Sequence, residues 1–407
     1  MNEAALAQGF SLTAPPPGFV ADPYPVYAAL RRHSPVHEWA PGSWLLTRHA
    51  DVLAAYREPT LSSEKRREFA PRLGEGSAIF EHHTSSLVFN DPPLHTRVRR
   101  LLMGALNQRA IARMEDGVEQ LVARLLAEMS GRSSCDLIED FAARIPVEVI
   151  GNLLDIPHPD RAPLRGWSLA VLSALEPAPD AALLARASVA VTEFCDYLRM
   201  LVAERRRSPG DPEADVLTRL IQGENNDPAE GSLSETELLH NCIFLLNAGH
   251  ETTTNLIGNG VHALLRQRRE FERLREHPEL MPSAVEELLR FESPLQFNNR
   301  LSTQPLVMGA QAIAAGSFIT LAIGAANRDE TVFTAPDQLD LARKPNPHLA
   351  FGQGAHACSG MNVARLEARV ALAGLLARFP RLDLDGAPER DPRLRFRGLR
   401  RLPVRLD

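Results

Sequence analysis

The chain has 407 residues, a formal net charge of −6 and four cysteines. A chain of this length can bury a large core without disulfides or structural metals. Its mildly acidic charge argues against a nucleic-acid-binding protein. No window approaches the roughly 18 apolar residues that span a bilayer, and the N-terminus lacks the features of a secretory signal. The sequence therefore predicts a cytoplasmic globular protein with neither nucleic acid nor a membrane among its partners.

The predicted elements begin with a partly Pro-rich segment, 1–20, which we expect to be extended or poorly ordered. An amphipathic helix at about 25–33 and short strands around Trp39 and 44–47 follow. Apolar residues then recur at intervals of three and four, which predicts helices over 94–106, 110–129, 137–154, 182–203, 234–266 and 267–292. Turn residues flank a short helix within 207–232, and strands and loops over 295–357 precede a helix at 359–378 and short closing strands. With no repeat or dividing linker, we predict a single mainly α domain over 1–407 with small peripheral β-sheets.

The most informative segment runs from Phe351 to Gly360 and reads Phe-Gly-Gln-Gly-Ala-His-Ala-Cys-Ser-Gly. It places Cys358 at the expected first turn of the following helix, where free amides and the helix dipole stabilise a thiolate. Gly352 and Gly354 permit positive φ angles and a close approach of the backbone to a flat ligand. The remaining cysteines are expected to be buried and inert: Cys135, Cys195 and Cys242.

The pattern FGxGxHxCxG resembles the haem-binding loop of the cytochrome P450 family, in which the cysteine thiolate is the axial ligand of the haem iron. The resemblance implies that haem b is the cofactor and that Cys358 is the metal ligand. It implies haem contacts for the other fixed positions of the loop, which are Phe351, Gly352, Gly354, His356 and Gly360. Motifs of this family follow in order from about residue 22 onward, so the resemblance also implies the cytochrome P450 fold, a single haem domain and a monomer.

Two other motifs overlap these segments. Gly352-x-Gly354 fits a dinucleotide-binding fingerprint, but only about fifty residues follow it, which is too few for the rest of a doubly wound sheet. His250-Glu251 begins like the HExxH motif of zinc proteases, but Thr254 occupies the second ligand position.

The helix predicted over 234–266 carries Ala248, Gly249, Glu251 and Thr252. Ala248 and Thr252 are four residues apart and share a face, and the Thr252 hydroxyl can bond back to the preceding turn. From the residues alone, a buried helix with a polar kink is an equally good interpretation. The segment AGxET resembles the oxygen-activating segment of cytochromes P450. The resemblance implies that Ala248 and Gly249 face the haem, that Glu251 is an acid and that Thr252 relays protons to dioxygen.

Glu287-x-x-Arg290 matches the ExxR motif of the same family. The spacing alone says little, because three solvated helical pairs share it: Glu64/Arg67, Glu270/Arg273 and Glu272/Arg275. Position selects Glu287 and Arg290, which precede the strand region about seventy residues before Cys358. The resemblance implies that Arg343 meets this pair and that the three residues hold the fold beneath the haem.

The segment from Asp91 to residue 100 resembles the propionate-binding helix of the family. His95 and Arg99 lie one turn apart on one face, and arginine pairs with carboxylates in a bidentate manner. A basic surface helix is the alternative interpretation. The resemblance implies that Arg300 and His356 complete the set of propionate partners.

The resemblance implies a haem-thiolate monooxygenase that hydroxylates, epoxidises or dealkylates an organic substrate with O2. All 407 residues belong to the haem domain, so electrons from NAD(P)H are expected from a separate ferredoxin and ferredoxin reductase. Five arginines form either a basic ferredoxin-docking patch or a solvated surface: Arg97, Arg100, Arg109, Arg113 and Arg365. The alternatives are a peroxide-using haem-thiolate enzyme and a haem-binding scaffold or sensor without turnover. The presence of Glu251 and Thr252 weighs against both.

The resemblance also places the walls of a substrate pocket around 79–89, 167–175, Leu245 and 295–298. These segments are mostly apolar, which predicts a moderately sized, largely hydrophobic substrate. The candidate pocket residues are Ile79, Phe80, Val88, Leu172, Leu245, Leu295, Gln296, Phe297 and Asn298.

Overall fold

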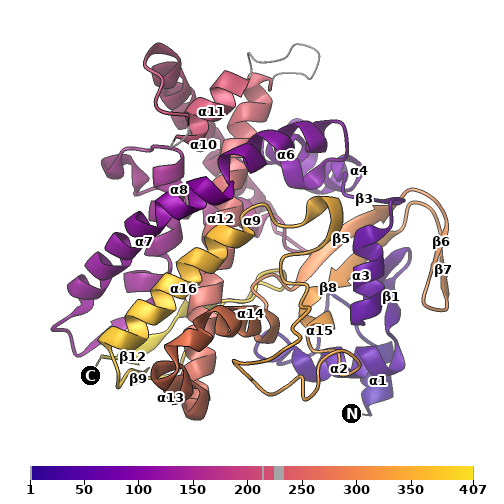
Figure 1. Cartoon of the computed structure of the whole chain (residues 1–407). Coiled ribbons are helices and arrows are strands. Elements are labelled where there is room, and N and C mark those ends of the chain that lie inside the picture. Colours follow the sequence, from indigo (N-terminus) through magenta and orange to yellow (C-terminus); the bar gives the residue numbers. More distant parts are fainter. Residues whose placement is uncertain (1, 213–214, 224–232, 407) are drawn as a thin grey trace.

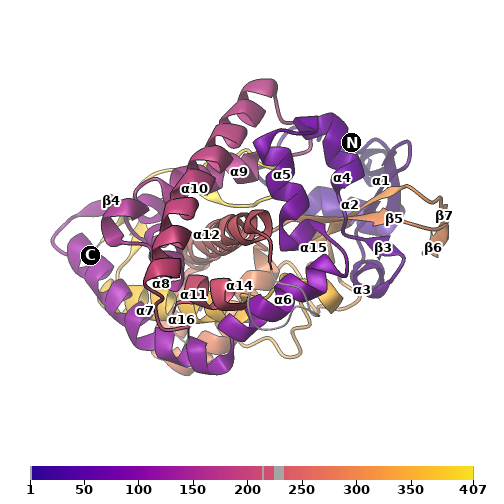
Figure 2. The same cartoon turned by 90° about the horizontal axis from the view of Figure 1, so that it is seen from above.

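The long helix α12, Glu235–Arg266, runs through the middle of the molecule, as Figures 1 and 2 show. The structure, a computed structural model, describes residues 2–212, 215–223 and 233–406. Ser234 caps α12 because its hydroxyl accepts a hydrogen bond from the Glu237 N–H and the Glu237 carboxylate accepts one from the Ser234 N–H. Every residue of α12 from Thr253 to Leu265 is buried. A helix buried on all sides forms the centre of a core, and α12 packs against α8, α9, α10, α14 and α16.

The other helices of the described chain surround α12 or extend from it. They are α1 (Glu3–Gln8), α2 (Tyr24–His33), α3 (His49–Arg57), α4 (Arg66–Phe69), α5 (Ala78–Ser85), α6 (Leu94–Ala105), α7 (Gln108–Met129), α8 (Arg144–Leu153), α9 (Leu164–Ser173), α10 (Ala181–Arg207), α11 (Val216–Gly223), α13 (Arg268–Glu276), α14 (Met281–Phe291), α15 (Ile323–Ala326) and α16 (Met361–Arg378). Among these helices, none combines the length and the apolar character needed to cross a lipid bilayer.

The strands form small sheets, the largest of which lies beside α2 and α3 (Figure 1). Its five strands follow the order β1 (Val36–Ala40), β2 (Ser43–Leu46), β8 (Phe318–Ala322), β5 (Phe297–Ser302) and β3 (Leu61–Ser62). The smaller sheets consist of β4 (Ser134–Asp136), β12 (Pro403–Arg405) and β9 (Asp383–Leu384); of β6 (Leu306–Met308) and β7 (Gln311–Ile313); and of β10 (Glu389–Arg390) and β11 (Leu399–Arg401).

The predicted fold class, mainly α with small β-sheets, is confirmed, but several predicted elements differ in detail. Residues 1–20 are not simply extended, because α1 occupies Glu3–Gln8 and Phe10, Leu12 and Phe19 are buried against α2. The expected helix over 267–292 divides into α13 and α14 around Pro278, which cannot continue a helix from the residue before it. The helix expected over 137–154 likewise begins as a separate turn at Ile138–Ala142 before α8. The predicted turn segment 207–232 lies partly outside the described residues.

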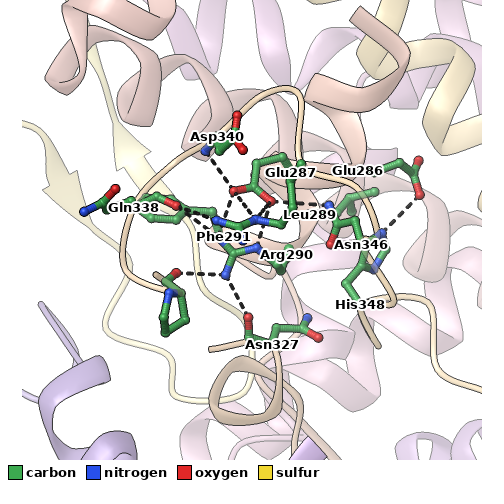
Figure 3. Close-up of polar contacts among 12 residues, drawn as sticks. Glu286, Glu287, Leu289, Arg290, Phe291, Asn327, Gln338, Asp340, Asn346 and His348 are labelled. Carbon is green, nitrogen blue, oxygen red and sulfur yellow. Dashed lines mark hydrogen bonds and ion pairs between the residues drawn. The ribbon is translucent and has the colours of Figure 1, made fainter. Parts of the chain in front are cut away.

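A carboxylate with no exposure to solvent joins α14 to the long loop before α16 (Figure 3). Glu287 accepts hydrogen bonds from Nε and Nη2 of Arg290, each at 2.8 Å. The Nε of Arg343 lies 3.0 and 3.1 Å from the two oxygens of the same carboxylate, and the Asp340 N–H donates to it at 2.9 Å. The Arg290 guanidinium also donates to the Asn327 carbonyl at 2.9 Å. A buried charge is tolerable only when it is paired and hydrogen-bonded in this way, so the cluster fixes the loop onto α14.

We therefore expect Arg290→Met to destabilise the protein by about 3–5 kcal/mol, because it leaves the Glu287 carboxylate buried with one cation fewer. The melting temperature, followed by far-ultraviolet circular dichroism, should fall sharply. Arg275→Met is the matched control, because Arg275 pairs with Glu272 at the surface, where both side chains are about one-third exposed. Equal melting temperatures for the two variants would contradict this role of the cluster.

Candidate functional site

A large cavity lies between α12, α6 and the loop that precedes α16. It contains about 1970 Å³ of space that atoms do not fill, part of which is open to solvent. From α12, Ala248, Gly249 and Thr252 line it, and from the loop Cys358 lines it. Other predicted site residues on its wall are His95, Arg99, Phe351, Gly352, His356 and Gly360. Gly354 and Arg300 lie behind this wall.

The loop that carries Cys358 is held by its own backbone. The Cys358 N–H donates to the Phe351 carbonyl at 2.8 Å, and the Ala357 N–H donates to the Gly354 carbonyl at 3.1 Å. Gly354 has a φ angle of +73°, and a Cβ at this position would lie 2.6 Å from the Tyr56 carbonyl oxygen. Only glycine fits such a site, as the sequence predicts. Cys358 precedes the helix rather than lying in its first turn, because α16 begins three residues later.

Cys358 differs from the other cysteines in what its sulfur faces. Its side chain is exposed to the cavity although it lies deep in the molecule. Burial raises the pKa of the Cys358 thiol, and the Gly360 N–H, Arg99 and Arg365 act in the opposite direction by favouring the thiolate. The other three cysteines are buried, and burial raises their pKa values to about 12 for Cys135 and Cys242 and about 11 for Cys195. This is the state expected of inert thiols.

Two arginines from different elements, Arg99 on the cavity wall and Arg300 outside it, act on His95 and His356. On α6, Arg99 donates from Nη1 to the Ala357 carbonyl at 2.8 Å and to the Ser359 hydroxyl at 3.1 Å. On β5, Arg300 is only 5% exposed and its guanidinium lies 5.5 Å from the centre of the Tyr56 ring. Arg99 thus contacts both residues that flank the cysteine.

Two histidines complete this basic group. The rings of His95 and His356 lie 4.0 Å apart, centre to centre. Burial lowers the pKa of His356 to about 3, helped by His95, Arg300 and Arg99, and burial lowers that of His95. The Nε2 atom of His95 is buried and has no hydrogen-bond partner in the described part of the chain. Asp91 is the carboxylate that raises the pKa of His95, and it already accepts hydrogen bonds from two serines.

The two polar residues of the α12 motif point in different directions. Thr252 lines the cavity, and its hydroxyl donates to the Ala248 carbonyl at 2.7 Å. Glu251 does not line the cavity and is 3% exposed. Its carboxylate pairs with Arg393 and accepts a hydrogen bond from the Asn255 amide at 3.0 Å. Neighbouring residues of a helix point in directions about 100° apart, so the Glu251 side chain points away from the cavity that Thr252 lines.

The predicted substrate-pocket residues divide into two groups. The cavity wall contains Val88, Leu172, Leu245, Leu295 and Asn298.

The prediction is wrong for the other four, none of which lines the cavity. Ile79 and Phe80 are buried in the core around α5. Gln296 accepts a hydrogen bond from the Tyr27 hydroxyl at 3.0 Å, and the ring of Phe297 packs edge-on against that of Tyr27. Both side chains therefore face α2, and Phe297 and Asn298, as neighbours on β5, point to opposite sides of the strand.

The polar residues His82, His83, Asn247 and Arg395 also line the wall and were absent from the predicted pocket set. The predicted pocket segment 79–89 included the two histidines without naming them. Asn247 directly precedes Ala248, so it does not share the helix face that the spacing of Ala248 and Thr252 selects. No local signal distinguished Arg395 from the other arginines near the C-terminus.

The residues present fit a haem. One thiol faces the cavity, and glycines let the backbone of its loop pass close to neighbouring groups. Arg99, His95 and His356 line one side of the cavity, and Arg300 acts on both histidines without lining it. Asp91, the carboxylate that acts on His95, is already hydrogen-bonded. Such a group of donors matches the two propionates of a haem, with Arg99, Arg300, His95 and His356 as partners and Cys358 as the iron ligand.

The five arginines suggested as a ferredoxin-docking patch are not equivalent. Arg97 pairs with Glu237, and Arg365 pairs with Glu286 at 2.7 and 2.8 Å. Arg100, Arg109 and Arg113 are exposed. Ion pairs thus offset part of the positive charge of this surface.

A mainly helical fold in which one cysteine faces a cavity beside a central helix is the arrangement of a haem-thiolate protein. Comparison with known proteins identifies the family. The family model of cytochrome P450 matches residues 177–403. The cytochrome P450 monooxygenase PikC of Streptomyces venezuelae is 36% identical over 399 residues, which cover 95% of this chain and 92% of that protein. The vitamin D(3) 25-hydroxylase of Pseudonocardia autotrophica is 38% identical over 394 residues, covering 95% and 94%. Among solved structures, P450BioI in complex with an acyl carrier protein ligated to hexadec-9Z-enoic acid has a TM-score of 0.90 at 32% identity, covering 96% of this chain and 100% of that one. The chain belongs to the cytochrome P450 family, which implies a haem cofactor and a monooxygenase.

A buried glutamate on α16 also reaches the cavity wall. Glu367 is 2% exposed, and burial raises its pKa to about 8, with the Thr253 hydroxyl favouring the ionised form in part. Because the pKa is higher in the folded chain than in the unfolded chain, the folded state holds a proton that the unfolded state releases between pH 4.5 and about 8. Stability contributed by this group is therefore present at pH 4.5 and lost as the pH rises to 8.

We expect Glu367→Gln, which keeps the shape and removes the charge, to stabilise the protein at pH 8.5 by on the order of 1–3 kcal/mol and to change little at pH 5. The measurement is the difference in melting temperature between variant and wild type at the two pH values. Glu119→Gln, at an exposed position of α7, is the control and should give the same difference at both. A difference for Glu367→Gln that does not grow with pH would contradict the assignment.

Proposed function

We propose that this cytochrome P450 inserts one atom of O2 into a moderately sized, largely apolar organic substrate, with electrons from NAD(P)H delivered by a separate ferredoxin and ferredoxin reductase. The observation that carries the proposal is that Cys358 and Thr252 line one cavity, together with the apolar residues Val88, Leu245 and Leu295. When bound, the haem would supply the iron at which dioxygen is activated.

The chain's own residues would hold the cofactor and control protons. We assign Cys358 as the iron ligand, with its backbone fixed by the Phe351 carbonyl, and Arg99, Arg300, His95 and His356 as partners of the propionates. These residues would hold the haem in the cavity.

Thr252 is the group we assign to proton control. While its hydroxyl donates to the Ala248 carbonyl, its oxygen is an acceptor toward the cavity, and rotation about χ1 would turn it into a donor. Glu251 pairs with Arg393 and does not line the cavity. We therefore assign Glu251 to supply protons to Thr252 through a movement of side chains or water, and not by a direct contact within the cavity.

Two observations bear on the alternatives. Both Glu251 and Thr252 are present, which favours a reaction that consumes protons over a peroxide-driven one or a haem-binding scaffold without turnover. The relatives differ in the substrates that their names indicate, one a vitamin D(3) hydroxylase and another bound to an acyl carrier protein, so membership of the family leaves the substrate open.

The proposal is tested with compounds that shift the ferric Soret band of the purified holoenzyme. With ferredoxin, ferredoxin reductase and NADPH, oxygenated product should form under air and not under argon. Product that forms only with added hydrogen peroxide would select the peroxide-using alternative, and no product under either condition would select the scaffold.

Thr252→Ala should alter how reducing equivalents are used without altering the haem. No iron ligand changes, so the ferric spectrum and the NADPH consumption with redox partners should persist. A positioned proton donor contributes about 10²–10⁴-fold to its step, so product per NADPH should fall several-fold while hydrogen peroxide rises.

Thr254→Ala is the matched control. Thr254 lies on the same helix and donates to the His250 carbonyl at 2.9 Å, but it does not line the cavity. Its coupling should equal that of the wild type. Equal coupling in Thr252→Ala as well would show that another group carries the proton.

A further inference from the structure

The cavity wall is mostly apolar, and its basic side chains fall into two groups. One group, beside the cysteine loop, contains Arg99, His95 and His356. The other lies elsewhere on the wall and contains Arg395, His82 and His83, together with the amide of Asn247. The second group has no part in the proposed chemistry at Cys358 or Thr252.

Arg395 is the middle one of three alternating arginines near the C-terminus. The segment pairs with residues 294–296, since the Gln296 N–H donates to the Arg395 carbonyl and the Arg397 N–H donates to the Pro294 carbonyl, each at 2.8 Å. Arg395 and the adjacent Phe396 line the cavity, whereas Arg393 and Arg397 do not.

Those two neighbours each have a carboxylate partner. Arg393 pairs with Glu251 and with Asp391, and Arg397 donates to the Glu292 carboxylate at 2.6 Å. In the part of the chain that the structure describes, the guanidinium of Arg395 makes no hydrogen bond or ion pair. Arg395 therefore differs from Arg393 and Arg397 in having no carboxylate partner among the described residues.

The carboxylates around Arg395 have other partners. Glu68 lies 3.2 Å from the Lys65 ammonium and 3.4 Å from the Arg72 guanidinium. Glu176 accepts backbone hydrogen bonds from Leu394 at 2.7 Å and from Arg395 at 3.3 Å.

Two carboxylates, Glu68 and Glu176, act on Arg395, and neither forms an ion pair with its guanidinium. Burial lowers the pKa of Arg395 to about 10, so its side chain remains protonated at neutral pH. A buried cation without a counter-ion is costly, and a ligand anion would remove that cost.

His83 supplies a second, independent feature of the same region. It is 2% exposed and lines the cavity, and neither ring nitrogen has a hydrogen-bond partner among the described residues. Burial lowers its pKa to about 3, with Arg72 and Arg395 acting in the same direction. The ring is therefore neutral at physiological pH and offers one N–H donor and one acceptor.

A haem propionate is the other carboxylate that could meet Arg395. Arg99 and Arg300 lower the pKa values of both His95 and His356, whereas Arg395 is not among the groups that act on either histidine. Arg395 acts on Tyr56 and Lys65 together with Arg300, and the carboxylates that act on it are Glu68 and Glu176. Haem retention in Arg395→Leu therefore distinguishes a substrate contact from a propionate contact.

We propose that the substrate is an amphipathic organic carboxylate whose carboxylate binds Arg395, with His83 as a second donor, and whose apolar body lies along Val88, Leu172 and Leu245. The proposal rests on the proposed function and deepens it by naming a substrate class. Arginine matches a carboxylate with two parallel hydrogen bonds, which fixes the acid end and presents the chain to the haem.

The test compares acids with their neutral counterparts on the holoenzyme at pH 7.5. The probes are decanoate, dodecanoate and 8-phenyloctanoate, each paired with its primary amide, and the readouts are calorimetric Kd and the shift of the ferric Soret band. The wild type should bind the acids about 10- to 100-fold more tightly than the amides. Arg395→Leu should abolish that preference, and Arg395→Lys should keep part of it.

Arg67→Leu, which removes an exposed arginine of α4, is the control for general surface charge and should leave the preference unchanged. Haem content should be equal in wild type and Arg395→Leu. Equal binding of acids and amides by the wild type, a preference that survives in Arg395→Leu, or no binding of any acid would overturn the proposal. Loss of haem from Arg395→Leu with the preference retained would assign the side chain to a propionate instead. Binding is measured without turnover, so failure of the monooxygenase reaction would leave the acid preference intact and is a separate result.

Discussion

A buried carboxylate on α14 sets the course of the chain that carries the iron ligand. Glu287 has no contact with solvent, so its charge requires Arg290 and Arg343, and Arg290 in turn donates to carbonyls of the loop that follows α15. Asn327, whose carbonyl is one of these acceptors, receives the Leu349 N–H on its side-chain oxygen at 2.7 Å. The constraint therefore reaches to within two residues of the cysteine loop.

The residue next to Glu287 extends the same constraint past the loop. Glu286 pairs with His348 at 3.1 Å on the near side of the loop and with Arg365 of α16 on the far side. Arg365 also lies 4.7 Å from the ring centre of Phe351, the first residue of the loop. Two successive glutamates of one helix thus hold both ends of the segment that presents Cys358. They therefore fix the position of the cysteine relative to the cavity.

Much of this arrangement could be predicted from the sequence, because the loop motif depends on local backbone requirements. Gly354 must be glycine wherever the loop passes Tyr56, and Ala248 and Thr252 share a face wherever their helix lies. The errors concern which side of an element faces the cavity. Asn298 and Phe297 are neighbours on a strand, and only Asn298 lines the pocket. The periodicity of a sequence shows that side chains alternate between two sides of a strand, but it does not show which side faces the cavity.

Arg395 could not be found in this way. Arg395 is distinguished by having no partner in the described structure, and that depends on Glu68 and Glu176 being engaged with other groups far away in the sequence.

The account as a whole rests on one bond, between the sulfur of Cys358 and the haem iron. The direct measurement is the absorption spectrum of the reduced protein under carbon monoxide, for wild type, Cys358→Ser and Cys135→Ser. We predict the strongly red-shifted Soret band of thiolate ligation in the wild type and in Cys135→Ser, and its loss in Cys358→Ser. A spectrum typical of histidine-ligated haem in the freshly purified wild type would contradict the account.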